Sequence, residues 1–152
     1  NDIAGINNVL SQSTSLSFVL ALLACFLIIS FGEVFLGFYG DAFIAGLPCL
    51  IILIFGHVVN SFCGPVAQVM FMTRYHKEAL FILLFTEILN ILLGLYLIKN
   101  YGIVGAALST AISMAVWNIV MVIFLRAKEN IKIDVFSLIK QPFYILKSRV
   151  FK

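Results

Sequence analysis

Apolar residues occur in this chain as four long runs with short polar stretches between them. The runs cover about residues 15–31, 42–63, 79–98 and 104–125, and each is 17 to 22 residues long. A helix rises about 1.5 Å per residue, so roughly 20 residues are needed to cross the hydrocarbon of a bilayer. The pattern therefore predicts an all-α transmembrane fold with four spanning helices.

The stretches between the runs predict where the chain turns. Residues 34–40 are rich in aromatic side chains, which favour the membrane interface, and Asp41 is placed to cap the second span. The Gly-Pro pair at residues 64–65 breaks the second helix, and the mixed apolar and basic segment that follows it indicates an interfacial hairpin. Residues 99–102 predict a tight turn, so the last two spans form an antiparallel pair.

Composition excludes an ordinary soluble domain. Hydrophobic residues make up 62% of the chain and charged residues 11%, whereas soluble domains carry roughly 45 to 50% apolar and 25% charged residues. Cys25, Cys49 and Cys63 each lie inside an apolar run without metal-ligand spacing, and we interpret them as small buried side chains. The chain opens with Asn1 rather than Met, and we expect it to be a piece of a longer protein.

Basic residues are concentrated on one side of the predicted bundle. With four spans, the N-terminal segment, the loop between spans two and three, and the tail share one side, which holds nine of the ten Lys and Arg residues. The opposite side has only Lys99. Short cytoplasmic loops are enriched in Lys and Arg, so we expect the N-terminal and C-terminal ends of this chain to be cytoplasmic.

A basic amphipathic tail, residues 131–152, follows the transmembrane portion, residues 1–130. From Arg126 to Lys152, seven Lys and Arg residues stand against Glu129 and Asp134, a net charge of +5. Apolar residues interleave with these cations, which suits the anionic cytoplasmic surface of a membrane better than nucleic acid. We therefore expect the chain to bind membrane lipids and not to bind nucleic acid.

One acidic residue lies well inside a predicted span. Glu87 is ten residues, roughly 15 Å, from Lys77 at the cytoplasmic edge of span three, which places it near the middle of the bilayer. Ionisable groups in hydrocarbon usually face a bundle interior or a wet cavity. We interpret the polar groups predicted at similar depth as candidate cavity or coupling residues: Glu87, Asn90, Asn118, His57 and Asn60.

Two interpretations of these polar groups stay open. In the first, they line a hydrated cavity, and Glu87 couples transport to a proton or a cation. In the second, the amides and His57 form hydrogen bonds between helices and never contact a substrate.

The fourth span begins with small residues at four-residue spacing. There are three such rows: Gly105, Ser109 and Ser113; Gly102, Ala106 and Thr110; and Ala107, Ala111 and Ala115. In lipid, small side chains let backbones approach closely, and van der Waals contact then holds the helices together. We expect these rows to pack against neighbouring helices.

No catalytic or metal-binding constellation occurs in the sequence. There is no HExxH motif, no phosphate-binding glycine loop and no nucleophile beside a base. We therefore expect a protein that is not an enzyme and that uses no cofactor and no metal.

Four stretches carry a resemblance to a known family. They are FGEVFLGFYGDAFIAGLPCLIIL at residues 31–53, NSFCGPVAQVMFMTRYHKEAL at 60–80, NILLGLYLIKNYGIVGAALSTAIS at 90–113 and WNIVMVIFLRAK at 117–128. The most specific signals are the Gly-Pro break followed by Thr-x-x-His-Lys, and the Lys-Asn-Tyr-Gly-Ile-Val-Gly-Ala-Ala turn. The chain resembles the C-terminal part of the polysaccharide flippases, the exporters of O-antigen and capsule within the multidrug/oligosaccharidyl-lipid/polysaccharide exporter superfamily. It departs from them at Arg74, where the family usually has a glycine.

The resemblance implies a larger helical bundle in two lobes, in which this chain supplies the last four helices and the remaining N-terminal helices are its partner. It implies transport of undecaprenyl-diphosphate-linked oligosaccharide to the periplasmic leaflet of the bacterial inner (cytoplasmic) membrane by alternating access. A diphosphate needs cations, and the four spans contain no Lys or Arg. Those cations then come from the missing helices or from Arg74 and Lys77 at the cytoplasmic mouth.

Three rival functions remain open. A cation-coupled multidrug exporter of the same superfamily would favour an acid such as Glu87 in its cavity. A non-transporting membrane subunit would hold glycosyltransferases through its small-residue rows and basic tail. A membrane-embedded glycan polymerase or acyltransferase would need periplasmic catalytic loops, for which the short turns leave little room.

Overall fold

Residues 3–129 fold into helices only. The computed structural model describes these residues, with side chains over residues 12–128, so the expected tail at 131–152 lies outside the described residues. The elements follow in the order α1 (Ile3–Gly37), the 3₁₀ helix η1 (Asp41–Gly46), α2 (Leu47–Cys63), α3 (Val66–Met72) and α4 (His76–Glu129). The predicted all-α class is confirmed for this part of the chain.

Three of the described helical segments are long and apolar enough to cross a membrane: Gln12–Gly37, Asp41–Cys63 and His76–Lys128. Large apolar side chains stay exposed along all three, with Phe26 65% exposed, Phe55 58% and Ile123 61%. Such a surface is stable against hydrocarbon and unstable against water, because no polar side chains cover it. The chain is therefore a multi-pass membrane protein.

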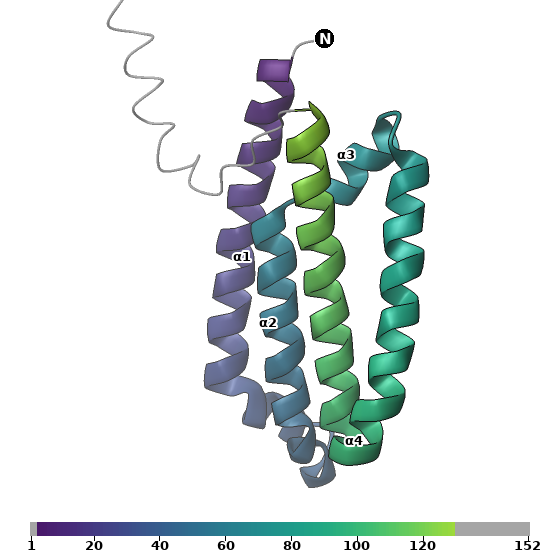
Figure 1. Ribbon diagram of the computed structural model, residues 1–152. Helices are drawn as coiled ribbons and strands as arrows, with labels where there is room; N and C mark the ends of the chain where they lie inside the picture. The colour runs from purple at the N-terminus through teal and green to yellow at the C-terminus, as the bar shows by residue number, and fades with distance from the viewer. Residues whose placement is uncertain (1–2, 130–152) are drawn as a thin grey trace, which may run out of the picture.

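Helix α4 reverses its direction at Gly102. This glycine has φ 58° and ψ −135° and interrupts the helical backbone, a conformation that costs little without a Cβ. Figure 1 shows the two arms of α4, residues 76–101 and 103–129, side by side. The expected turn at residues 99–102 thus narrows to a single residue, since 99–101 remain helical.

The second apolar run is divided between two helices. A single helix is expected from residue 42 to 63, but η1 comes first and α2 begins at Leu47. Pro48 lies in the first turn of α2, where backbone N–H groups make no hydrogen bond within the helix, so its lack of an N–H costs nothing there. Asp41 is the first residue of η1 rather than its cap, and Gly40 occupies the cap position.

A short helix, α3, occupies the expected interfacial hairpin between the second and third runs. Gly64, with φ 74°, and Pro65 end α2. Val66 and Met70 of α3 are completely buried in a cluster with Tyr75, which precedes α4, and with Ala79, Met121 and Leu125 from the two arms of α4. Helix α3 therefore closes one end of the molecule, which we call the α3 end.

The long segments form a row rather than a closed bundle. Across Figure 1 the order is α1, α2, the second arm of α4 and the first arm of α4. Helix α2 packs on α1 and on α4, and the rings of Phe18 and Phe62, 5.6 Å apart, join α1 to α2. A Cβ built on Gly56 of α2 would lie 3.2 Å from the Cα of Ala111. The second arm of α4 is thus an inner element of the row, between α2 and the first arm.

Candidate functional site

Two close contacts set the register of the helices along the row. Gly56 lies against Ala111, and a Cβ built on Gly94 of the first arm would lie 3.6 Å from Oγ of Ser109. Helix α2 runs parallel to the second arm of α4, and the first arm runs antiparallel to it (Figure 1). The two contacts serve as reference levels. Because a helix rises about 1.5 Å per residue, the number of residues from each contact gives the relative depth of residues on different helices.

Four of the predicted site residues lie at nearly the same depth. Counted from the two contacts, His57 and Asn60 are level with positions 112 and 115 of the second arm. Asn90 and Glu87 are level with positions 113 and 116. All four therefore fall within about 6 Å along the axis of the row.

Glu87 and His57 also lie on the same side of the row. His57 follows Gly56, the residue that contacts the second arm, and Glu87 follows Thr86, which is buried. Helix α2 and the first arm run in opposite directions and flank the second arm from opposite sides. Each successive residue of an α-helix is turned by about 100° about the helix axis. His57 and Glu87, each one residue after a packed residue, therefore point to the same side of the row.

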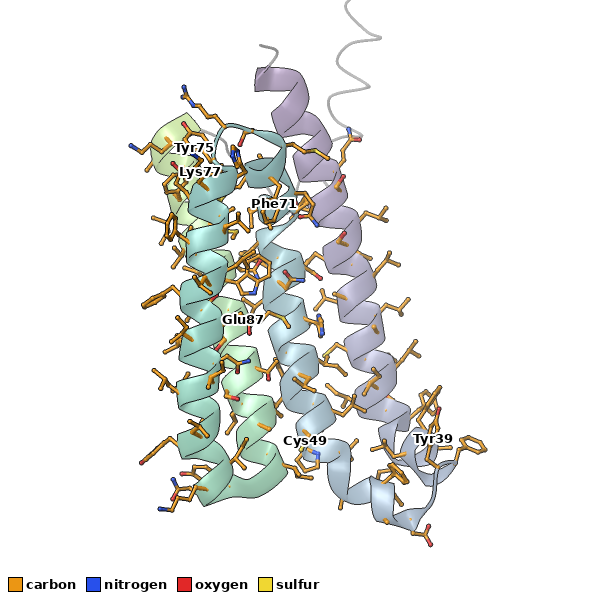
Figure 2. The ribbon with its side chains drawn as sticks, turned by 90° about the vertical axis from the view of Figure 1, so that its right-hand side faces the viewer. Tyr39, Cys49, Phe71, Tyr75, Lys77 and Glu87 are labelled. Carbon is orange, nitrogen blue, oxygen red and sulfur yellow. The ribbon has the colours of Figure 1, made fainter. Side chains whose placement is uncertain are left out.

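We call this side the open face and define it by His57, Asn60, Glu87 and Asn90. His57 and Glu87 are exposed, whereas Asn60 and Asn90 are half-buried beside the packed surfaces. Figure 2 shows Glu87 about halfway along the first arm, with its side chain on the side that turns toward α2. The open face is therefore a polar patch at mid-depth between helices that are otherwise apolar.

Asn118 lies close to the same depth but not on the open face. Its side chain is fully buried, and Nδ2 donates a hydrogen bond to the carbonyl of Met114 at 2.8 Å. Its Oδ1 is buried and has no hydrogen-bond partner among the described residues. An unpaired buried carbonyl costs about 1 to 3 kcal/mol. The structure thus separates Asn118 from the other four candidates.

The row Gly105, Ser109 and Ser113 lies in the packed part of the second arm. A Cβ on Gly105 would collide with the carbonyl of Leu97, and Ser109 contacts Gly94, so this row faces the first arm. Ser109 Oγ donates to the carbonyl of Ala106 at 2.9 Å. Ser113 is buried, and its Oγ has no hydrogen-bond partner in the part of the chain that is described. The row joins the two arms of α4.

Arg74 and Lys77 lie at the α3 end, apart from the open face. Both side chains are exposed, and the Cζ of Arg74 is 5.1 Å from the ring centre of Tyr75. Figure 2 shows Lys77 and Tyr75 at the end of the first arm. Lys77 is roughly 15 Å along the helix from Glu87, so the basic residues at the α3 end and the open face lie at different depths.

The open face does not have the composition of a metal site. Within the described residues, no group of three His, Cys, Asp or Glu side chains is placed to hold a metal ion. The three cysteines are free thiols; Cys63 is buried, and Cys25 and Cys49 are half-buried.

Sequence reasoning missed two polar groups near the α3 end. Thr14 of α1 is completely buried and lies against Gly64, so that α1 contacts the break between α2 and α3. One carboxylate oxygen of Glu78, Oε2, is buried without a hydrogen-bond partner in the described part of the chain. The hydroxyl-rich residues 11–15 at the start of the first run were the available signal for Thr14.

Comparison of the chain with protein-family models, with curated proteins and with solved structures finds no match.

Proposed function

We propose that this chain is part of an exporter that flips undecaprenyl-diphosphate-linked oligosaccharides across the bacterial inner membrane by alternating access. The observation that carries the proposal is the open face, where an acid, an imidazole and two amides share one side and one depth. Polar groups at the middle of a bilayer are unstable against lipid and belong against a wet cavity or other helices. A second lobe facing the open face would supply the other helices and would enclose a wet cavity between the two lobes.

In this proposal each arm of α4 crosses the membrane separately. The first arm, residues 76–101, is roughly 39 Å long, which exceeds the roughly 30 Å of hydrocarbon. With α1 and the η1–α2 segment this makes four crossings. The α3 end is cytoplasmic, because it holds most of the described basic residues, Arg74, Lys77, Arg126 and Lys128.

The chemistry of the open face suits a glycan. The amides of Asn60 and Asn90 each offer hydrogen-bond donors and an acceptor. Sugar hydroxyls both donate and accept hydrogen bonds, so these amides can bind them. The open face offers no cation to a diphosphate, which would instead meet Arg74 and Lys77 at the cytoplasmic mouth or cations on the other lobe. The resemblance to the polysaccharide flippases supports the same substrate class.

Glu87 is the coupling residue in this proposal. It is the one acid near the middle of a described crossing, since Glu33, Asp41 and Glu78 lie toward the ends. Binding and release of a proton or a small cation at its carboxylate would change the charge of the open face between the two access states.

The test is Glu87→Gln in the cell that makes this protein, with Glu33→Gln as the matched control. Glu33 is an exposed acid near the end of α1, so the control makes the same substitution away from the open face. We expect Glu87→Gln to reduce surface polysaccharide and to accumulate lipid-linked oligosaccharide on the cytoplasmic leaflet, and Glu33→Gln to do neither. Unchanged export by Glu87→Gln at every external pH and membrane potential would refute the coupling role.

One observation favours a second candidate, a cation-coupled multidrug exporter. Glu87 carries the charge of the open face, and no Lys or Arg accompanies it there, an arrangement that attracts amphipathic cations. Deletion of the gene separates the two functions: loss of surface polysaccharide supports the flippase, and a gain of drug sensitivity supports the drug exporter. A scaffold acting through the small-residue rows is disfavoured, because Gly105, Ser109 and Ala111 already face helices of this chain.

A further inference from the structure

The corner between α3 and α4, residues 66–77, has two surfaces of opposite character. Val66 and Met70 on one side of α3 are completely buried. On the other side Phe71 is 44% exposed and Met72 is 88% exposed. Two large apolar side chains are therefore presented outward by a helix of only seven residues, which in water would be unfavourable.

Basic side chains follow these apolar side chains directly. Arg74, His76 and Lys77 are all exposed. The guanidinium of Arg74 lies 5.1 Å from the ring centre of Tyr75, and this cation–π contact restricts its position. Tyr75 is itself held in place, because it is buried and its ring packs edge-on against Phe124 at 5.3 Å.

The apolar and basic side chains of the corner lie at different depths. Figure 2 shows Phe71 nearer the middle of the helices than Tyr75 and Lys77, which lie at the end of the first arm. Acyl chains and phosphate groups are arranged in the same order within one leaflet of a bilayer. The corner thus matches the lipid interface in polarity and in depth.

We propose that the α3–α4 corner binds the headgroup of an anionic glycerophospholipid. Arg74 and Lys77 contact the phosphate and its anionic headgroup, while Phe71 and Met72 contact the acyl chains just below. Charge complementarity selects an anionic lipid over a zwitterionic one. The exposed apolar pair selects a lipid over free phosphate. This site is separate from the open face, and lipid binding there does not depend on which substrate the protein transports.

The test compares lipid binding by two charge-matched variants of the full chain. Native mass spectrometry measures the occupancy of phosphatidylglycerol and of phosphatidylcholine on Arg74→Gln/Lys77→Gln and on Arg126→Gln/Lys128→Gln. Arg126 and Lys128 are exposed at the same end of the molecule, so the control loses the same charge outside the corner, residues 66–77. Both variants keep residues 130–152 intact, so any contribution of that segment is common to both.

We expect the Arg74/Lys77 variant to lose phosphatidylglycerol binding roughly tenfold, and the Arg126/Lys128 variant to lose less than about threefold. Phosphatidylcholine binding should change in neither. Equal losses from the two variants would overturn the proposal, because they would show a general effect of charge. Displacement of the bound phosphatidylglycerol by inorganic phosphate alone would also overturn it.

A second measurement tests the depth of the corner without removing charge. Met72→Trp in a Trp117→Phe background places a single fluorophore beside the proposed lipid. Quenching by brominated phosphatidylglycerol should exceed quenching by brominated phosphatidylcholine at the same mole fraction, with the excess lost when Arg74 and Lys77 are replaced. No quenching by either lipid would contradict contact between the corner and lipid, and equal quenching by both would contradict its selection of an anionic lipid.

Discussion

Gly56 of α2 and Ala111 of α4 stand against each other with almost no side-chain volume between their backbones. A Cβ built on Gly56 would lie 3.2 Å from both the Cα and the Cβ of Ala111. Within a membrane the hydrophobic effect does not drive helices together, and close van der Waals contact takes its place. This contact therefore holds α2 to the second arm of α4.

Enlarging Gly56 should weaken that contact. We expect Gly56→Val to lower the free energy of unfolding by about 1 to 3 kcal/mol, because the added methyl groups meet the backbone of the second arm. Unfolding in mixed micelles, followed by the fluorescence of Trp117, measures the change. Gly37→Ala is the control, since a Cβ there meets nothing within 4 Å. A Gly56→Val variant as stable as the parent would show that the two helices are not in contact at this point.

Alanine at Gly105 should be more harmful than alanine at Gly102. A Cβ on Gly105 would collide with the carbonyl of Leu97, whereas a Cβ on Gly102 meets nothing within 4 Å and carries only the strain of φ 58°. We expect about 1 to 3 kcal/mol for Gly102→Ala and a larger loss for Gly105→Ala. Thermal unfolding of the two variants side by side gives the order, and the reverse order would contradict the packing of the two arms.

Thr14 and Gly64 should be coupled energetically. Gly64→Ala adds a Cβ that would collide with Thr14 Oγ1, and it also strains a backbone at φ 74°. Thr14→Ala removes the colliding hydroxyl but not the backbone strain. The double variant should therefore recover part of the loss, with a coupling energy of about 0.5 to 3 kcal/mol in a double-mutant cycle. Additive effects would mean that α1 does not press on the break between α2 and α3.

Asn118→Leu should leave the fold as stable as before or stabilise it by about 1 kcal/mol, because it removes a buried carbonyl without a described partner. Asn118→Ala should instead destabilise, since it leaves a cavity. Chemical unfolding of both variants measures the difference. A loss of stability in Asn118→Leu as large as in Asn118→Ala would show that the amide has a partner, such as a buried water.

The long helices were predictable because a bilayer requires each crossing to satisfy its own backbone hydrogen bonds. Apolar length therefore locates the segments, and the runs at residues 79–98 and 104–125 fall within the two arms of α4. The division at Leu47 was not predictable from apolar length, because η1 and α2 belong to one continuous apolar run. Local backbone geometry, and not hydropathy, decides where one helix type gives way to the other.

The candidate site was predictable in depth but not in direction. Counting residues places Glu87 and Asn118 near one level, yet only the contacts of Gly56 and Gly94 with the second arm show which side chains stay outside the packing. The four-residue spacing of small residues in the second arm likewise predicted close packing, but it did not indicate which helices pack there. The pairing of Thr14 with Gly64 joins residues far apart in sequence, and no local pattern signals it.

The position of the second arm of α4, between α2 and the first arm, has a consequence for how the chain is made. Both α2 and the first arm pack on this segment, yet the ribosome synthesises it after both of them. Until residues 103–129 leave the ribosome, α2 and the first arm are in the membrane or at the insertion machinery without the second arm, on which both of them pack. We expect nascent chains that stop before residue 103 to be bound by membrane chaperones and degraded, which pulse-labelling of nested truncations would detect. Because α2 and the first arm both pack on this segment, we expect the protein to reach its full stability only when its last described helix is inserted.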